Sequence, residues 1–442
     1  MNAITRRTFV KTSLAASAGF SVLPGGRAAS PNEKILVGVM GAGGRGSYLA
    51  QAFAKRKDAE IAWLCDPDSR RLDWARKTVE AAQGRAPRVG QDFRRILDDP
   101  KVDVLVNATP DHWHVLGSIL ACQAGKDVYV EKPMSHNIWE GRKLIEAAQK
   151  YRRIVQVGTQ SRSAPYAKEA ADYIKSGKLG EVHLVRVFNL MQHSMMTLGP
   201  EQAPPEGFDY ELWCGPAAKL PYRPGREWLN MAEYSCGPIP GDAVHQLDLA
   251  RFLLGDPSYP ETVVHSGGLR VLQDGRDTPD TQFALFDYGK LTLQFEGALW
   301  TPYMKKTPML VRDTNQLPNW TFNSTKIEVL GTRGFMFMGR HGDGWQVFNE
   351  EGESIIASSP KQSDQEHQDN FIECVRSRRQ PNASAEQGHH STLLSHLANV
   401  SWRVGNKKLA FDAKTETFVG APEANQYLKR AYRAPWVIPE KV

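Results

Sequence analysis

The chain has 442 residues, 41% of them hydrophobic, which is enough to bury large cores and typical of a protein with two domains. Its formal net charge of +6 is misleading, because the first 30 residues hold four basic and no acidic residues and leave +2 for the rest. No run rich in Lys and Arg stands out, so nucleic acid is excluded as an expected partner. No segment is long and apolar enough to span a membrane.

The five cysteines point to no special chemistry. Their count is odd and no C-x-x-C occurs, so they predict neither a disulfide framework nor a zinc site. Cys65 and Cys122 lie in apolar stretches and are expected to be small core residues. A disulfide between Cys214 and Cys236 stays open.

The N-terminal segment has the features of a twin-arginine export signal. Residues 5–11 read Thr-Arg-Arg-Thr-Phe-Val-Lys, a modestly apolar stretch follows over 14–23, and small residues end it near Ala28 and Ala29. We predict a signal peptide over 1–30, the twin-arginine export machinery as a partner, and a periplasmic or exported protein. The alternatives are a chance Arg pair in a cytoplasmic arm and an uncleaved segment that tethers the protein to the membrane.

Residues 31–158 alternate between short apolar strands and amphipathic helices. The strands are apolar on successive residues, as parallel strands covered on both faces should be. This alternation predicts an N-terminal doubly wound parallel sheet of the Rossmann type. The expected strands are 35–40, 60–65, 102–108, 128–130 and 154–157, and the expected helices are 45–54, 69–82, 112–124 and 138–151.

A G-x-G-x-x-G turn joins the first strand to the first helix. Gly41 permits the tight turn, Gly43 lets the backbone approach a pyrophosphate, and Gly46 lets helix and strand pack closely. Gly44 and Arg45 open the helix, whose positive end faces the phosphates. The turn predicts a dinucleotide site.

An acidic residue at the end of the second strand decides between the two nicotinamide dinucleotides. Asp66 is placed to accept hydrogen bonds from the ribose hydroxyls and to repel a 2′-phosphate, which favours NAD(H) over NADP. The alternative is that Asp66 caps the next helix, but Asp68 can fill that role. Arg70 and Arg71 follow closely and could soften the preference.

In residues 159–442 the regular alternation of strands and helices ends. A long strand over 182–189, an excursion rich in Pro, Gly and Trp over 199–240 and a helix over 243–254 come first. Turns containing Gly then separate several strands, which predicts an α+β domain with a large, open, mostly antiparallel sheet. The remaining strands are expected at 263–272, 282–286, 291–295, 326–330, 334–338 and 345–348, and helices at 364–378 and 385–404.

Two motifs follow the fourth and fifth strands of the parallel sheet. Residues 108–114 read Ala-Thr-Pro-Asp-His-Trp-His, and 129–133 read Tyr-Val-Glu-Lys-Pro. Both lie at the carboxyl edge of the sheet, where doubly wound folds bind ligands. Taken alone, Lys132 reads as a solvated lysine at the end of a strand.

Together with the glycine turn, these motifs make the chain resemble the glucose–fructose oxidoreductase / inositol dehydrogenase family (Gfo/Idh/MocA). Thr-Pro-Asp-His-Trp-His over 109–114, Glu-Lys-Pro over 131–133 and Gly-Asp-Ala-Val-His-Gln-Leu-Asp-Leu over 241–249 carry the resemblance. The segments 157–163 and 213–216 resemble the exported, sugar-processing branch of the family. The resemblance covers essentially the whole chain after the leader.

The resemblance implies roles for individual residues. Lys132 would contact the reacting hydroxyl beside the nicotinamide, and His245 would act as the general acid/base that takes the hydroxyl proton. Glu131 would position Lys132 and the cofactor, and Pro133 would shape the turn, through a cis bond in some such turns. The remaining residues expected at the cofactor are Thr109, Pro110 and His114.

The chain departs from the family at one position. Dehydrogenases of the family usually carry an Asp four residues before the histidine. In this chain that position is Gly241, and Asp242 stands three residues before His245. Both offsets can fall on the histidine face of a helix, so Asp242 is either a substrate contact or the cap of its helix. Asp248, three residues after His245, could orient the imidazole or face elsewhere.

Other polar and aromatic residues are weaker candidates for a carbohydrate pocket. Flat aromatic faces and Arg side chains suit sugar rings, but the same residues can simply pin a long loop to the body. We predict no metal site, because the late histidines read as helix caps and surface pairs. The candidates for substrate contact are Gln160, Arg162, Tyr166, Trp213, Arg226 and Asp248.

The leader and the dinucleotide site together restrict the function. Free NAD(H) belongs to the cytoplasm, so an exported enzyme is expected to hold its cofactor tightly. The first hypothesis is an oxidoreductase that acts on a secondary hydroxyl of a sugar, cyclitol or glycoside. The alternative is a glycosidase or epimerase that oxidises transiently with no net redox change, as in the family's α-N-acetylgalactosaminidase branch. A non-catalytic binding protein is the third possibility, and a homo-oligomer, dimer or tetramer, is expected in each case.

Overall fold

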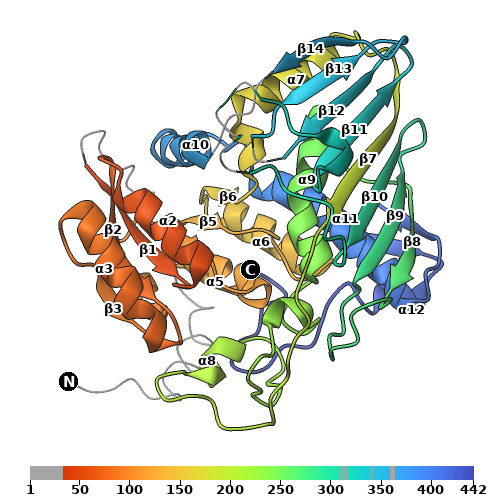
Figure 1. Cartoon of the computed structure of the whole chain (residues 1–442). Coiled ribbons are helices and arrows are strands. Elements are labelled where there is room, and N and C mark those ends of the chain that lie inside the picture. The colour runs from red at the N-terminus through yellow and green to blue at the C-terminus, as the bar shows by residue number, and fades with distance from the viewer. Residues whose placement is uncertain (1–32, 309–310, 312–313, 315, 341, 359–363) are drawn as a thin grey trace, which may run out of the picture.

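The computed structural model describes residues 33–308, 311, 314, 316–340, 342–358 and 364–442. Within these residues the chain forms two sheets that stand side by side, each with helices packed against it (Figure 1). The predicted export signal over 1–30 lies outside the described residues. No helix of the described part is long and apolar enough to cross a membrane.

A parallel sheet of six strands forms the first domain. In spatial order its strands are β3 (Arg88–Gly90), β2 (Ala59–Cys65), β1 (Ile35–Met40), β4 (Val104–Asn107), β5 (Asp127–Val130) and β6 (Val155–Val157). All neighbouring strands are parallel, and β1, β4, β5 and β6 are almost fully buried. This confirms the predicted doubly wound sheet.

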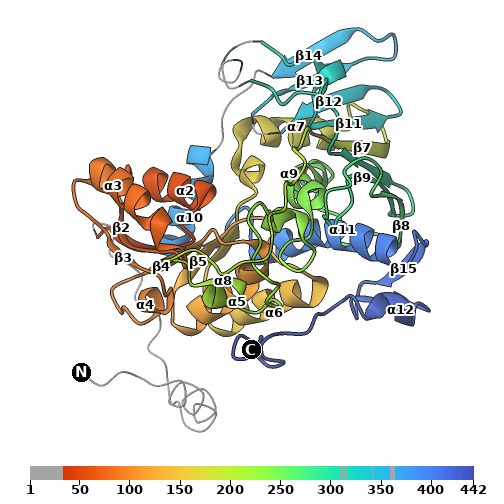
Figure 2. The ribbon, with the colours of Figure 1, turned by 60° about the horizontal axis from the view of Figure 1, so that its bottom comes forward.

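Helices cover both faces of this sheet. They are α2 (Gly44–Ala54), α3 (Leu72–Gln83), α4 (Arg94–Leu97), α5 (Asp111–Gln123), α6 (Ile138–Lys150) and α10 (Asp364–Ser377). Apolar residues of α2, α3 and α10 form the core on one face, and those of α4, α5 and α6 form the core on the other. Although α10 comes late in the chain, it packs beside α2 (Figure 2). The sequence pattern does not predict β3 or α4, which are too short to show a period.

A mixed sheet of ten strands forms the second domain, as predicted. In spatial order its strands are β14 (Ser354–Ser358), β13 (Trp345–Phe348), β12 (Phe335–Gly339), β11 (Lys326–Gly331), β7 (Val182–Leu190), β10 (Thr292–Ala298), β9 (Thr281–Asp287), β8 (Thr262–Gly268), β15 (Leu409–Asp412) and β16 (Thr417–Val419). Of the pairs in the described sheet, β7 with β10 is parallel and the others are antiparallel. The pattern does not predict the short strands β14, β15 and β16.

The apolar residues of one sheet face pack against α7 (Pro165–Lys175), α9 (Pro238–Leu253) and α11 (Ala385–Arg403) in a single large core (Figure 1). Two short helices, α8 (Tyr210–Cys214) and α12 (Pro422–Asn425), lie in the connections. The five cysteines are all free, so the Cys214–Cys236 disulfide that the sequence left open is not formed.

Helix α9 begins five residues before its predicted start. Its N-cap is Gly237, with φ 102°, and Pro238 occupies the first helical turn, where the missing N–H costs nothing. Asp242 therefore lies inside the helix, and the alternative that it caps the helix is wrong. The sequence hid this start because two prolines within three residues normally mark a loop.

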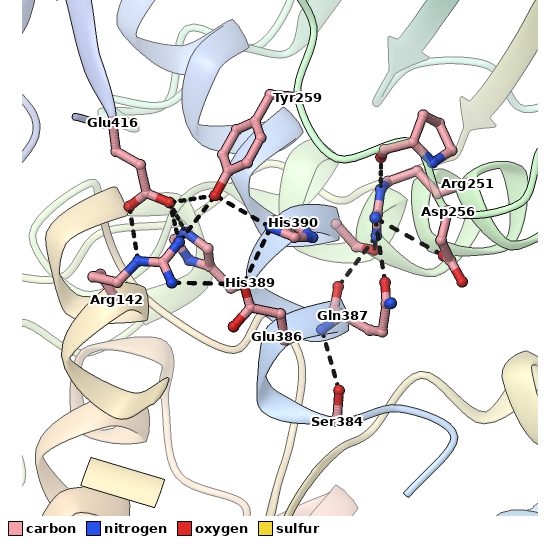
Figure 3. Close-up of polar contacts among 12 residues, drawn as sticks. Arg142, Arg251, Asp256, Tyr259, Ser384, Glu386, Gln387, His389, His390 and Glu416 are labelled. Carbon is pink, nitrogen blue, oxygen red and sulfur yellow. Dashed lines mark hydrogen bonds and ion pairs between the residues drawn. The ribbon is translucent and has the colours of Figure 1, made fainter. Parts of the chain in front are cut away.

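A partly buried polar network joins the two domains between α6, α11 and the β15–β16 hairpin (Figure 3). Glu416 forms an ion pair with Arg142, accepts a hydrogen bond of 2.7 Å from the Tyr259 hydroxyl and lies 2.8 Å from His389 Nε2. His390 Nε2 lies 3.2 Å from the same hydroxyl. Burial raises the pKa of Glu416, but the bonds from His389 and Arg142 outweigh it and leave the pKa well below its usual range.

We expect Glu416→Gln to lower the free energy of unfolding by about 2 kcal/mol at neutral pH, because three donors lose a charged acceptor. The pKa of Glu416 is lower in the folded than in the unfolded protein, so its contribution is present above the unfolded pKa and is lost as the pH falls. Urea unfolding from pH 7 to pH 3 should therefore show a smaller loss for the variant than for the wild type. Glu423→Gln, in an exposed pair with Lys407, is the control. Equal pH dependence in wild type and Glu416→Gln would contradict the expectation.

Candidate active site

The glycine turn between β1 and α2 leaves no room for side chains at two positions. Gly41 has φ 91°, and a Cβ there would lie 2.7 Å from Ala108 O. A Cβ on Gly46 would lie 1.8 Å from Gly41 O. The first glycine therefore makes the turn and the third lets α2 pack onto it.

The N-terminus of α2 presents its backbone to the turn. Gly43 is the N-cap, and no side chain of the described residues caps the helix. Arg45 directs its guanidinium to Glu131, with Nε donating to Oε1 at 2.8 Å, and Glu131 also accepts from the backbone N–H of Lys132. Burial raises the pKa of Glu131, but the charges of Arg45 and Lys132 lower it by more. The pKa of Glu131 therefore lies below its usual range. An uncapped helix N-terminus of this kind suits a pyrophosphate.

Asp66 is buried at the end of β2 and holds the turn. It accepts the N–H of Ala42 at 2.7 Å and the N–H of Asp68 at 2.9 Å, one on each oxygen. Each oxygen keeps a second lone pair for a ribose hydroxyl. Burial raises the pKa of Asp66. Asp68 caps the short 3₁₀ helix Ser69–Arg71, as predicted, and pairs with the side chain of Arg70.

Lys132 and His245 meet in one cavity of about 650 Å³. Lys132 follows β5, its peptide bond to Pro133 is cis, and its Nζ donates to Gly241 O at 3.3 Å. His245 lies on α9 and is 5% exposed. The predicted cofactor residues that line this cavity are Gly41, Gly43, Gly44, Arg45, Asp66, Thr109, Pro110, Glu131 and Lys132.

Two predicted cofactor residues support the site from behind. Gly46 packs against Gly41, as described above. His114 is buried and does not line the cavity; its Nδ1 lies 2.6 Å from Pro133 O and its Nε2 lies 2.8 Å from Thr109 O. We therefore correct its expected role from cofactor contact to positioning of the two loops that carry Thr109 and Lys132.

Asp242 lies beside Lys132 in a second, smaller cavity of about 180 Å³. Arg340, from the turn after β12, forms a bidentate ion pair with Asp242 at 2.6 and 2.9 Å, and Lys306 Nζ lies 3.3 Å from the same carboxylate. Burial raises the pKa of Asp242, but the charges of Arg340 and Lys306 hold it well below its usual range. Lys132 lines both cavities and so stands where they meet.

Three of the expected substrate contacts do not line either cavity. Arg162 is buried in ion pairs with Asp248, at 2.7 Å, and with Asp256, at 2.6 Å. Asp248 also accepts from the Ser391 hydroxyl. The Tyr166 hydroxyl accepts from the N–H of Gly342 at 2.9 Å. The expectation of substrate contact is wrong for Arg162, Asp248 and Tyr166, because a buried charge or hydroxyl needs internal partners and these residues have found them.

The other expected substrate contacts do reach the main cavity. Gln160, Trp213 and Arg226 line it. Trp213 also stacks on Tyr210, with ring centroids 5.6 Å apart, and contacts His112. The sequence left open whether Trp213 lines a pocket or packs a long loop against the body. In the structure its side chain does both.

The sequence analysis missed Arg340, Lys306 and Asp111. Asp111 lines both cavities and accepts the N–H of Cys236 at 3.1 Å. Asp111 belongs to the motif over 108–114, so its place directly after the fourth strand could have indicated a site residue. Arg340 and Lys306 lie in segments with no motif, about 98 and 64 residues from Asp242, and only the packing of the second domain brings them to the site.

Two family models match the chain. The model described as "Oxidoreductase family, NAD-binding Rossmann fold" matches residues 35–159, and the model described as "Oxidoreductase family, C-terminal alpha/beta domain" matches residues 330–438. Together they cover more than half of the chain. The protein belongs to the Gfo/Idh/MocA family of oxidoreductases.

Individual relatives are more distant. A levoglucosan dehydrogenase of Pseudarthrobacter phenanthrenivorans is 26% identical over 254 residues, covering 54% of this chain and 58% of that protein. A glycosyl hydrolase family 109 protein of Solibacter usitatus is 32% identical over 147 residues, covering 31% of this chain and 34% of that protein. The matches thus span less than two thirds of these relatives.

Solved structures share the fold over most of the chain. A levoglucosan dehydrogenase in complex with NADH and levoglucosan has a TM-score of 0.65, with 18% identity, and the alignment covers 86% of this chain and 99% of that chain. The WlbA dehydrogenase of Bordetella pertussis, in complex with NADH and UDP-GlcNAcA, has a TM-score of 0.62 and 21% identity over 86% of this chain and 99% of that chain. At these identities the likeness shows the fold alone.

Proposed function

We propose that the protein is an NAD(H)-dependent oxidoreductase that acts on a secondary hydroxyl of a sugar, cyclitol or glycoside, and that it retains its cofactor through many turnovers. The observation that carries this proposal is the shared cavity, which the glycine turn and Asp66 line together with Lys132 and His245. The carbohydrate class rests on what the levoglucosan dehydrogenases and family 109 relatives act on by name.

His245, Lys132 and Asp242 have different roles in the proposed oxidation. When bound, NAD supplies the two-electron acceptor. His245 takes the proton of the substrate hydroxyl as its general base. Lys132, fixed by Gly241 O, donates a hydrogen bond to the reacting oxygen and stabilises the charge that develops on it. Asp242, held as an anion, accepts a hydrogen bond from a neighbouring hydroxyl.

The cofactor preference is proposed to be NAD(H) over NADP. Asp66 repels a 2′-phosphate. Of the two arginines that could soften the preference, Arg70 is already bonded to both oxygens of Asp68, whereas Arg71 lines the cavity beside Gly43. The proposed location is the periplasm or the cell exterior, reached through the twin-arginine machinery, and a homo-oligomer stays the expected assembly. Retention of the cofactor would reconcile this location with the dinucleotide site.

A second candidate is a glycosidase or epimerase that oxidises its substrate transiently and restores the cofactor within one turnover. The similarity to several glycosyl hydrolase family 109 proteins favours it. Reactions of this kind need no external supply of cofactor, which fits the predicted export.

One experiment separates the two candidates and tests both. The exported protein is purified, one portion is denatured to release bound NAD(H), and the native remainder is incubated with nitrophenyl glycosides and with free sugars. Release of nitrophenol without added cofactor supports the second candidate, and a ketosugar formed with reduction of the cofactor supports the first. If the purified protein contains no NAD(H) and also fails to bind added NAD(H), both candidates are overturned.

We expect Arg340→Gln to raise KM for the carbohydrate about tenfold, because Asp242 loses its bidentate partner. The pKa of Asp242 should rise, because the variant removes the charge of Arg340 and leaves those of Lys306 and Lys132. His193 also lies close enough to interact with Asp242. The acidic limb of kcat/KM should therefore move to higher pH. Steady-state kinetics from pH 4 to pH 9 measures both effects.

The control for this variant is Arg186→Gln. Arg186 pairs with Glu328 on the second sheet at 2.7 Å, and neither residue lines the two cavities. Its removal should leave KM and the pH profile unchanged. An unshifted profile in Arg340→Gln, with normal cofactor content, would show that Arg340 does not control Asp242.

A further inference from the structure

A segment of the second domain reaches back over the loop that carries Asp66. We call residues 196–234 the aromatic arm; its buried residues include Met196, Tyr210, Cys214, Ala217, Met231 and Tyr234. Helix α8 lies within it and sits close to α5 of the first domain in both views (Figures 1 and 2). The arm thus connects the substrate domain to the carboxyl edge of the parallel sheet.

The arm is hydrogen-bonded to the turn after Asp66. Phe208 forms a backbone bridge with Asp68, and the flanking bonds are Ser69 N–H to Gly207 O, 2.9 Å, and Asp209 N–H to Pro67 O, 2.9 Å. The approach is close at Gly207, whose φ is 79° and where a Cβ would lie 2.5 Å from Ser69 Oγ. The two segments therefore behave as one short, backbone-paired unit.

A side chain from a third loop locks this pairing. Gln91, which follows β3, donates from Nε2 to Pro67 O at 2.8 Å and to Gly207 O at 2.9 Å. The amide group spans both segments, so separation of the arm from the turn breaks these bonds as well. Behind the arm, Trp113 Nε1 donates to Leu212 O and Trp213 O.

The arm and the first domain enclose the same end of the main cavity. Asp66 marks this end as the adenosine end, because an acidic residue at the close of the second strand binds the adenosine ribose in this fold. Aromatic side chains suit an adenine ring, which offers a flat apolar face. The cavity is lined by Phe208, Tyr210 and Leu212 of the arm and by Asp66, Gln91 and Phe93 of the first domain. The backbone bridge between Phe208 and Asp68 and the bond from Gln91 to Pro67 O place Phe208 and Gln91 beside Asp66.

We propose that the aromatic arm forms the outer wall of the adenosine subsite, so that the cofactor leaves only when the arm lifts from the turn after Asp66 and from Gln91. The proposal rests on the proposed function in one respect, the binding of NAD(H). It assigns Phe208 and Tyr210 to cofactor binding, although they belong to the substrate domain. It also gives a physical basis for a retained cofactor, since the opening must break backbone bonds and aromatic packing before dissociation.

The test measures how fast the cofactor leaves. Trp213 and Trp228 line the cavity, so tryptophan excitation should sensitise the emission of bound NADH. The protein is loaded with NADH, mixed with excess NAD⁺, and the decay of this emission gives the dissociation rate. We expect the double variant Phe208→Ala/Gln91→Ala to release NADH at least about tenfold faster than the wild type, as follows from losing about 1.4 kcal/mol. Phe322→Ala, which removes a half-exposed phenylalanine from the second domain, should leave the rate unchanged.

A second measurement does not depend on the aromatic substitutions. Trypsin can cut the arm after Arg226, and bound NADH should slow this cleavage in the wild type if the arm closes on the cofactor. Ser69→Ala, which removes only the bond from Ser69 Oγ to Gly207 O, should give an intermediate release rate. NADH release from the double variant within twofold of the wild type, or cleavage unaffected by NADH, would overturn the assignment of the arm. Failure of the wild type to bind NADH at all would instead overturn the proposed function together with it.

Discussion

We expect His245→Ala to lower the turnover rate for the carbohydrate about a thousandfold, while the protein keeps its normal content of NAD(H). His245 is 5% exposed and lines the cavity together with Lys132, so its imidazole is placed to take the hydroxyl proton. Water cannot replace it efficiently in a site this enclosed. Single-turnover kinetics with the retained cofactor measures the loss at the chemical step.

Lys132→Ala should cause a loss of similar size, because the developing oxyanion then lacks the charged donor that Lys132 supplies. The matched control is His183→Ala, which removes an exposed histidine of β7. Either variant of the site retaining full activity with normal cofactor content would contradict the assignment of roles. A loss of cofactor along with activity would instead place the residue in cofactor binding alone.

The second large effect is expected at the glycine turn. Gly46→Ala should weaken NADH binding about a hundredfold or more, because the new Cβ would lie 1.8 Å from Gly41 O and must push the turn away from the helix N-terminus. The substitution adds one methyl group and removes no side-chain contact, so the effect reports the geometry of the turn. Fluorescence titration with NADH measures the dissociation constant, and circular dichroism checks the fold.

Gly90→Ala is the matched control for this variant. Gly90 ends β3 of the same sheet, and a Cβ there would meet Arg95 and Trp63 at 3.8 and 3.9 Å, which is ordinary contact. Its NADH affinity should stay close to that of the wild type. Similar affinities in Gly46→Ala and Gly90→Ala would mean that the close approach of α2 to the turn is not required for the dinucleotide.

The order of elements and the motifs of the site could be predicted from the sequence. Each depends on local signals: apolar runs for buried parallel strands, glycines at fixed spacing for the turn, and polar motifs directly after strands. Because the carboxyl ends of parallel strands share one edge of the sheet, Asp66, Thr109 and Lys132 follow from their place after a strand. The cavity that contains all three agrees with this expectation.

The surroundings of the charged groups could not be predicted in this way. The sequence places Arg162 and Asp248 beside candidate site residues, yet the structure pairs them with each other in the core. It offers no signal for Arg340, which reaches Asp242 from the second sheet. A buried ion needs a partner, but which partner it finds depends on how distant segments pack.

The sequence of this protein therefore determines its parallel sheet, its mixed sheet and the glycine turn between β1 and α2, because these depend on residues close together in the chain. Only the tertiary structure decides that Asp242 is a clamped anion inside α9, that α10 returns to the first sheet, and that the aromatic arm lies over the turn after Asp66. These features depend on contacts between segments far apart in the chain, whose pairing is fixed by the packing of whole helices and sheets rather than by local pattern.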